Sequence, residues 1–187
     1  MIRQATETDI AVIGESYTQL LTYEQEQGGF SNWQLGVYPT VQVAEARVPR
    51  GGMYVLVEAG ELCASMVLNR EQAPEYADVS WAYRAEPTQV LVIHTLCIPP
   101  QCAGHGYGTQ MVRFAQDYAR LQGCTVIRLD TYAHNEPTKH LYRKLGFRIA
   151  GWGRMRLQGL IDEEQVYAGL FRMQVSLILT GKVGALS

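Results

Sequence analysis

The sequence predicts an α/β domain built on a mixed sheet flanked by helices, and three observations carry this prediction. Residues 53–58 and 62–68 form two strand patterns joined by a tight turn, which is typical of an antiparallel hairpin. Residues 89–98 form a β-prone run that is apolar on both faces, as in a central strand. A helical pattern and another strand pattern follow that run, in the order of a parallel strand–helix–strand unit.

The other elements follow in order along 187 residues, a length that fits one domain spanning 1–187. N-cap residues and helical spacing predict helices over residues 10–21 and 41–48, from the glycine-rich segment to Gly123, and over 135–145 before Gly146. Alternating or continuous apolar residues predict the remaining strands. These lie at 2–5, 79–83, 125–132, from 147–150 onward, and at 167–177.

Composition narrows the class of protein. The net charge of −2 gives no reason to expect nucleic acid or an anionic membrane as a partner. The sequence shows neither a signal-peptide pattern nor an apolar run of about 18 residues. The four cysteines form no C-x-x-C pair, so we expect a reducing cytoplasm, with Cys102 exposed in a loop and the other three in the core. Histidine spacing predicts no metal site.

The most informative segment is 96–108, where an apolar strand runs into Gly104, Gly106 and Gly108 and a helix follows. Glycines let backbone N–H groups crowd around a ligand, and a helix start adds free donors and the positive end of a dipole. The segment therefore predicts a phosphate-bearing ligand.

Several phosphate-binding folds compete for this segment. A dinucleotide-binding or methyl-donor fold also has an acidic residue after the next strand, and Asp130 holds that place. That fold needs a third glycine, where this chain has Thr109 or Met111, and it does not begin with an antiparallel hairpin. A nucleotide P-loop needs G-K-[ST] after its glycines, and none follows here.

A second segment, 135–147, completes a family pattern. Together the two segments resemble the GCN5-related N-acetyltransferase (GNAT) superfamily, whose patterns are L-x-V-x-P-x-x-R-G-x-G-x-G and N-x-x-A-x-x-L-Y-x-K-L-G-F. Two departures are Ala103, where Arg or Gln is usual, and Thr138, where Ala is usual. Residues 33–40 resemble a bacterial subgroup whose acceptor the sequence does not identify. The matching residues are Leu96, Ile98, Pro100, Gly104, Gly106, Gly108, Asn135, Leu141, Tyr142, Lys144, Leu145, Gly146 and Phe147.

The resemblance implies a GNAT-like sheet of six to seven strands with a cofactor core at about 90–151. It implies direct transfer of an acetyl group from acetyl-CoA to a primary amine, carried by a small molecule or by a peptide or protein. A monomer or a homodimer fits equally. The residues expected to bind the cofactor are Leu96, Cys97, Ile98, Ala103, Gly104, His105, Gly106, Tyr107, Gly108, Thr109 and Asn135.

Candidate catalytic residues follow from this chemistry. Tyr142 holds the family position for the acid that protonates the leaving thiolate. His94 is a candidate base for the amine, and an equally good candidate for a structural histidine in the sheet. Asp130 and Glu26 are further candidates for a base or an amine anchor.

The acceptor pocket is the least defined part of the prediction. Trp33, Tyr38 and Trp81 are candidates to line it, although packing in the core or in a lid explains each of them as well. A different class of function also remains open, since the same glycine loop serves an acyl-CoA-binding sensor or scaffold without transferase activity. A methyl-donor enzyme is the third alternative.

Overall fold

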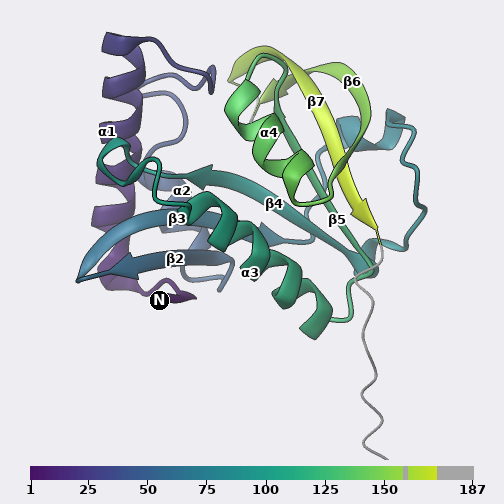
Figure 1. Cartoon of the computed structure of the whole chain (residues 1–187), viewed down its shortest axis with the longest axis horizontal. Coiled ribbons are helices and arrows are strands. Elements are labelled where there is room, and N and C mark those ends of the chain that lie inside the picture. The colour runs from purple at the N-terminus through teal and green to yellow at the C-terminus, as the bar shows by residue number, and fades with distance from the viewer. Residues whose placement is uncertain (158–159, 172–187) are drawn as a thin grey trace, which may run out of the picture.

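The computed structural model describes residues 1–157 and 160–171. Its strands form one seven-stranded sheet in the order β1-β2-β3-β4-β5-β7-β6, in which β4 and β5 are parallel and all other neighbours are antiparallel (Figure 1). The mixed sheet predicted from the sequence is therefore confirmed. The strands are β1 (Ile2–Gln4), β2 (Met53–Glu58), β3 (Glu61–Asn69), β4 (Val90–Cys97), β5 (Val126–Tyr132), β6 (Arg148–Leu157) and β7 (Ile161–Phe171).

Four helices cover the two faces of the sheet, and strand alternation separates the two cores. On β2, Tyr54 and Leu56 pack in the cluster under α3 and α4, whereas Met53 and Val55 pack in the cluster under α1 and α2. The sheet therefore has one helix pair on each side. The helices are α1 (Ile10–Gln27), α2 (Val41–Arg47), α3 (Tyr107–Leu121) and α4 (Glu136–Lys144). None of the helices in the described part of the chain has the length and apolarity to cross a bilayer.

The parallel strands β4 and β5 separate soon after they begin. Their ladder pairs only Val90–Val92 with Val126–Arg128, and Figure 1 shows the two strands diverging from that point. A register shift in the β3–β4 ladder marks a bulge, and Thr95 in it has a φ of +48°. Beyond Val92, the edge of β4 that faces β5 is therefore free of strand pairing in the described structure.

Three sequence expectations need correction. Residues 79–83 form a loop and not a strand. The apolar side chains of Val79, Trp81 and Tyr83 alternate with exposed ones because one side of this loop packs against the buried cluster that contains Val90 and Tyr167. Cys102 is buried rather than exposed, because its short loop folds back onto the core. The last strand begins at Ile161 rather than at residue 167, and residues 172–177 of the expected strand lie outside the described residues.

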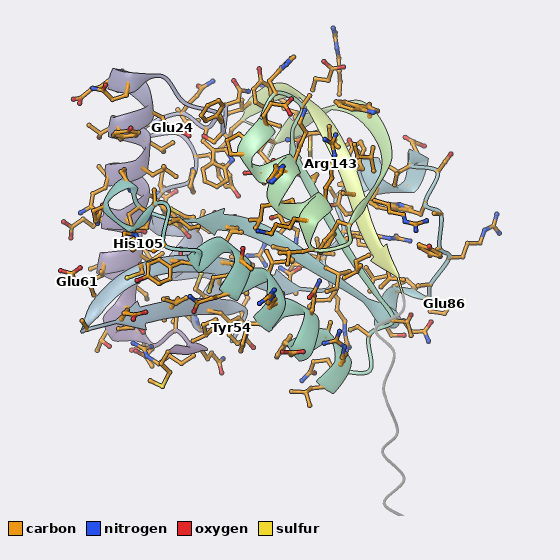
Figure 2. The ribbon with its side chains drawn as sticks, in the orientation of Figure 1. Glu24, Tyr54, Glu61, Glu86, His105 and Arg143 are labelled. Carbon is orange, nitrogen blue, oxygen red and sulfur yellow. The ribbon has the colours of Figure 1, made fainter. Side chains whose placement is uncertain are left out.

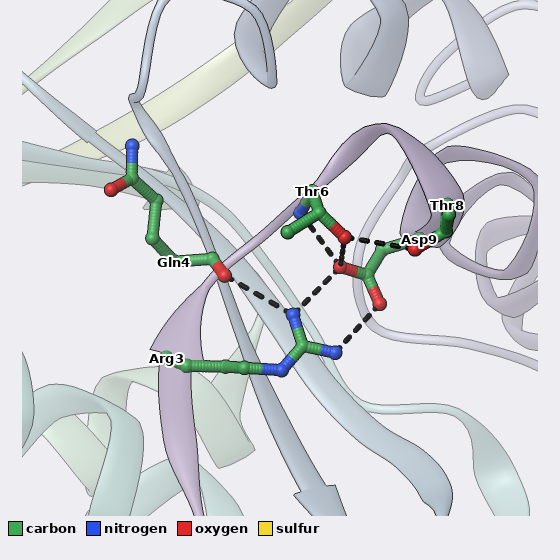
Figure 3. Close-up of polar contacts among 5 residues, drawn as sticks. All are labelled: Arg3, Gln4, Thr6, Thr8 and Asp9. Carbon is green, nitrogen blue, oxygen red and sulfur yellow. Dashed lines mark hydrogen bonds and ion pairs between the residues drawn. The ribbon is translucent and has the colours of Figure 1, made fainter.

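A bidentate ion pair fixes the passage from β1 into α1 (Figure 3). The Arg3 guanidinium donates to both carboxylate oxygens of Asp9, at 2.7 and 2.8 Å. The backbone N–H and the hydroxyl of Thr6 donate to Asp9 Oδ2, at 2.7 and 2.8 Å. The hydrogen bond from Arg3 is the main reason why the pKa of Asp9 lies well below its usual range.

We expect Asp9→Asn to lower the free energy of unfolding near neutral pH by about 1 kcal/mol, because it removes a charge-assisted pair and its cap contacts. A carboxylate with a depressed pKa stabilises the fold above its unfolded-state pKa of about 3.9, and this stabilisation is lost as the pH falls through the folded-state pKa. The difference between wild type and variant should therefore shrink in acid. Urea unfolding at a series of pH values measures this difference in the free energy of unfolding, and Glu7→Gln, which replaces an exposed carboxylate, is the control. A difference that does not change with pH would show that the charge of Asp9 does not stabilise the fold.

Candidate active site

A cavity of about 1210 Å³ opens where β4 and β5 diverge. Its floor is the free part of β4, including His94 and Leu96, and its walls come from α1 and α2 on one side and from β5, α4 and β6 on the other. Figure 2 labels Glu24 on α1, which lines the cavity, and His105 in the loop before α3. The cavity thus joins segments that are more than a hundred residues apart in the sequence.

The glycine loop leaves the first turn of α3 open. Gly104 and Gly106 have φ values of +80° and +77°, a conformation that other residues adopt only with strain. Gly106 is the N-cap of α3 and carries no side chain to accept from the first-turn N–H groups. These donors are therefore available to an anion, while Ala103 lines the adjoining cavity.

Gly108 serves packing rather than backbone freedom. A Cβ at this position would lie 3.1 Å from both Ile98 Cδ1 and Leu141 Cδ2, so its absence lets α3 approach β4 and α4 closely. Of its neighbours, His105 is exposed, its ring stacks on Tyr107 at 5.7 Å, and its Nδ1 donates to the Ala103 carbonyl oxygen at 3.0 Å. The Cys97 thiol is buried on the α1 side, against Ser16 O, so only the backbone of this residue is available to a ligand.

Tyr142 lies on α4, which Asn135 begins by accepting the Thr138 N–H on its Oδ1 at 3.1 Å. The Tyr142 ring packs against Phe147 with centroids 5.3 Å apart. Burial, helped by the charge of Asp130, raises the pKa of its hydroxyl above the usual value. Tyr142 lines the cavity, and no hydrogen bond to its hydroxyl is found among the described residues. This group therefore stays protonated at neutral pH and is free to donate.

His94 is held as a neutral ring in a defined tautomer. Its Nε2 lies 3.0 Å from Asn69 Oδ1, which also accepts the Glu71 N–H at 2.9 Å. Because that oxygen can only accept, Nε2 carries the proton and Nδ1 is left as the acceptor. Burial, with a contribution from Arg47, lowers the pKa of His94 to about 4. At neutral pH the ring is therefore neutral with Nδ1 unprotonated, and the lowered pKa makes it a weaker base than an ordinary histidine.

Of the candidate acceptor residues, the structure brings Trp33, Tyr38 and Asp130 to the cavity. Tyr38 is fixed by its hydroxyl, 2.7 Å from Thr95 Oγ1 in the bulge of β4, and Trp33 meets it edge to face at 6.0 Å. Trp81 lies outside the cavity lining, within the loop between β3 and β4, where it packs in the cluster of Tyr76 and Tyr167. Glu26 does not line the cavity either, whereas Glu24, one helical turn away from the cavity-facing Leu20, does.

The chain matches the model of the "Acetyltransferase (GNAT) family" over residues 17–147, which is most of its length. The chain belongs to the GNAT family of acetyltransferases. This family assignment confirms the resemblance seen in the two sequence motifs.

Solved GNAT structures share the whole fold. A GNAT acetyltransferase from Listeria monocytogenes superposes with a TM-score of 0.70 at 19% identity, over 92% of this chain and 94% of that one. A Salmonella typhimurium structure, described as an acetyltransferase with its cofactor acetyl-CoA, has a TM-score of 0.64 at 18% identity and covers 94% and 96% of the two chains.

Curated relatives match over a shorter stretch. An uncharacterized N-acetyltransferase of Methanocaldococcus jannaschii is 30% identical over 82 residues, which are 42% of this chain and 36% of that protein. Streptothricin acetyltransferase of Streptomyces lavendulae is 33% identical over 75 residues, 40% of each. The matched part thus spans about two fifths or less of these relatives' length.

Sequence reasoning about this GNAT chain missed several lining or supporting residues. Tyr76 lies in a loop without periodicity and contacts Asp130 from 54 positions away. Asn69 ends β3, as polar residues commonly end strands, and its importance comes from the contact of its Oδ1 with His94. Thr95 becomes notable only through the bulge, which depends on the register of the neighbouring strand. No local pattern in the sequence marks any of the three. Among the described residues, no group of three His, Cys, Asp or Glu side chains is arranged to hold a metal ion.

Proposed function

We propose that this chain is an N-acetyltransferase that transfers the acetyl group of acetyl-CoA directly to a primary amine. One observation carries the proposal: a cavity at the divergence of β4 and β5 is lined both by the free segment of β4 and by Tyr142, and it adjoins the open first turn of α3. Membership of the GNAT family supports the same chemistry.

The residues present fit acetyl-CoA. The N–H groups of the segment from Gly104 to Thr109 suit the pyrophosphate, and they require no basic side chain at Ala103. The backbone of Leu96, Cys97 and Ile98 lies past the end of the β4–β5 ladder, so the N–H and C=O groups on the edge away from β3 are available to pair with the pantetheine amides as an added strand would. An N–H of this segment also suits the thioester carbonyl oxygen.

Two side chains then carry the protons. Acetyl-CoA supplies the acetyl group as a thioester, and the C–S bond breaks as the new C–N bond forms. His94 takes up at Nδ1 the proton that the ammonium loses to become a nucleophile. Tyr142 donates its proton to the departing sulfur, and the second proton that the nitrogen loses as the amide forms restores the Tyr142 hydroxyl. An ordinary phenol, with a pKa of about 10, is close enough to a thiol to protonate a departing thiolate. Burial raises the pKa of Tyr142 above that value, which keeps the hydroxyl protonated until the sulfur leaves.

The acceptor is the amine of a small molecule or of a peptide or protein. Among the described residues that line the cavity, the carboxylates Glu24, Glu71, Glu75 and Asp130 outnumber the guanidinium groups of Arg47 and Arg156. Trp33 and Tyr38 add aromatic surface. This lining suits a cationic acceptor with some apolar body, and Asp130 is the proposed anchor of its amine.

Release of free thiol from acetyl-CoA, measured with a panel of amines, tests the proposal. We expect release that depends on one class of amine, together with acetylated amine identified by mass spectrometry. Tight binding of acetyl-CoA without turnover on any amine would instead favour an acyl-CoA-binding sensor or scaffold.

Ala103→Arg tests how the pyrophosphate is held. An arginine beside the glycine loop adds a charge-assisted contact to phosphate, so we expect acetyl-CoA to bind roughly 3- to 10-fold more tightly. Because Ala103 is exposed, the change should leave stability unaltered. Calorimetric titration, with Ala103→Leu as a control of equal bulk without charge, measures the effect. An affinity unchanged by the arginine would show that this loop holds the cofactor differently.

A further inference from the structure

Tyr76 contacts the cavity residue Asp130 from a part of the chain that neither family motif includes. It lies in the β3–β4 loop, residues 70–89, and its buried hydroxyl donates to Asp130 Oδ1 at 2.5 Å. Asp130 is half-buried at the end of β5 and lines the cavity. Among the described residues, only Oδ1 of this carboxylate accepts a hydrogen bond. Oδ2 is thus the atom left for a ligand.

An aromatic cluster holds Tyr76 in place. The Trp81 indole Nε1 donates to the Tyr76 carbonyl oxygen at 2.9 Å, and the two rings lie 5.2 Å apart. Tyr167, which pairs with Asp130 in the β5–β7 ladder, meets the Tyr76 ring edge to face at 5.7 Å. Both ends of the hydrogen bond between Tyr76 and Asp130 are therefore supported by the same strand pair.

Arg128 ties the loop to β5. It precedes Asp130 by two residues and so projects from the same face of the strand. Its guanidinium lies 4.3 Å from the centre of the Trp81 ring and donates to Gln72 Oε1 at 2.5 Å. This buried arginine is engaged by the loop, and it forms no ion pair with Asp130.

The neighbours of the Asp130 carboxylate do not include a cation that pairs with it among the described residues. The carboxylate faces Tyr76 and Glu75 from the loop, Tyr142 from α4 and Tyr167 from β7, all of them neutral or acidic. Among the described residues, no lysine, arginine or histidine pairs with its carboxylate. A half-buried carboxylate without a cation is costly, and a cationic ligand relieves that cost. Asp130 also lies close enough to Tyr142 to affect its hydroxyl, so a cation held here is beside the proposed acid.

We propose that Asp130 binds the ammonium group of the acceptor and that Tyr76 is the positioning residue that aims this carboxylate, with Trp81 and Arg128 anchoring the loop. The inference rests on the proposed function and deepens it. In this arrangement the β3–β4 loop controls how tightly the acceptor binds, and the glycine loop controls how tightly acetyl-CoA binds. The acceptor is then an aliphatic amine that is protonated at neutral pH.

A double-mutant cycle tests the coupling. We expect Tyr76→Phe and Asp130→Asn each to raise the KM of the amine about 10-fold, and the double variant to be no worse than Asp130→Asn alone, because Tyr76 acts through Asp130. The KM of acetyl-CoA should not change. Tyr54→Phe is the matched control, since Tyr54 is a buried tyrosine on β2 that packs against α3, away from the cavity (Figure 2). If the double variant raises the KM of the amine by the product of the two single effects, the proposal is overturned. A rise in the KM of acetyl-CoA as large as that in the KM of the amine also overturns it.

The pH profile gives a second readout, which a merely structural role of Tyr76 would not move. Burial raises the pKa of Asp130, and the hydrogen bond from Tyr76 opposes that rise. Removing the hydroxyl should therefore shift the acid limb of kcat/KM for the amine to higher pH, and Asp130→Asn should remove that limb. An acid limb that stays in place in Tyr76→Phe contradicts the positioning role.

The proposed function and this inference fail in different ways. If acetyl-CoA binds but no amine is acetylated by the wild type, the proposed function is wrong. Calorimetric titration of spermidine and of 2-phenylethylamine into the CoA-saturated protein then decides the inference. Weaker binding of either amine to both Tyr76→Phe and Asp130→Asn supports it, and binding unaffected by these changes overturns it.

Discussion

Replacing Tyr142 by phenylalanine is expected to lower kcat by about 10²-fold while leaving the affinity for acetyl-CoA unchanged. The hydroxyl is the only group removed, and no hydrogen bond to it is found among the described residues, so its loss leaves no donor or acceptor unsatisfied. Stability should therefore stay the same or rise slightly. Steady-state kinetics together with thermal unfolding separates loss of the acid from loss of the fold.

Tyr118→Phe is the matched control for this change. Tyr118 lies on α3 and packs against Tyr54 with ring centroids 5.2 Å apart, outside the cavity lining. It should keep full activity. A Tyr142→Phe variant with wild-type kcat would remove Tyr142 from the mechanism and leave water or another donor as the source of the proton.

His94→Gln is expected to lower kcat/KM for the amine by about 10²-fold at neutral pH. The loss should shrink as the pH rises above the pKa of the amine, where the free base no longer needs its proton removed. Because burial lowers the pKa of His94 to about 4, the wild-type profile should show no inflection near 6.5, the ordinary value for histidine.

The pH dependence of kcat/KM between about pH 5 and 11, a range that passes the amine pKa of about 10.4, measures this effect. His140→Gln, which replaces an exposed histidine on α4, is the control and should leave the profile unaltered. Rates that are equal in His94→Gln and wild type at every pH would make His94 structural, as its contact with Asn69 also allows.

Much of the fold could be predicted because its signals are local. The hairpin of β2 and β3, the glycine loop and the caps of α4 depend on residues within a few positions of one another. Tyr142 and the glycine loop were candidates for the same reason, through motifs that occupy short segments, and His94 was a candidate because it lies two residues before Leu96 on the same face of the strand.

The remaining features depend on contacts between distant segments. The bulge at Thr95 arises from the register of β3 against β4, and Tyr76 reaches Asp130 across 54 positions. The alternation of Val79, Trp81 and Tyr83 is real, but it reflects a loop packed on the sheet rather than strand pairing. The burial of Cys102 likewise follows from how its loop folds onto the core.

Thermal unfolding with added acetyl-CoA tests the central claim, that this cavity and its glycine loop bind acetyl-CoA. At a concentration about 100 times the Kd, ligand binding adds roughly 2.7 kcal/mol to the stability, so we expect a rise in Tm on the order of 5 to 10 °C. Free CoA should give a similar rise and S-adenosylmethionine none. An unchanged Tm at saturating acetyl-CoA, or a rise with S-adenosylmethionine in its place, would mean that the cavity and its glycine loop do not bind acetyl-CoA.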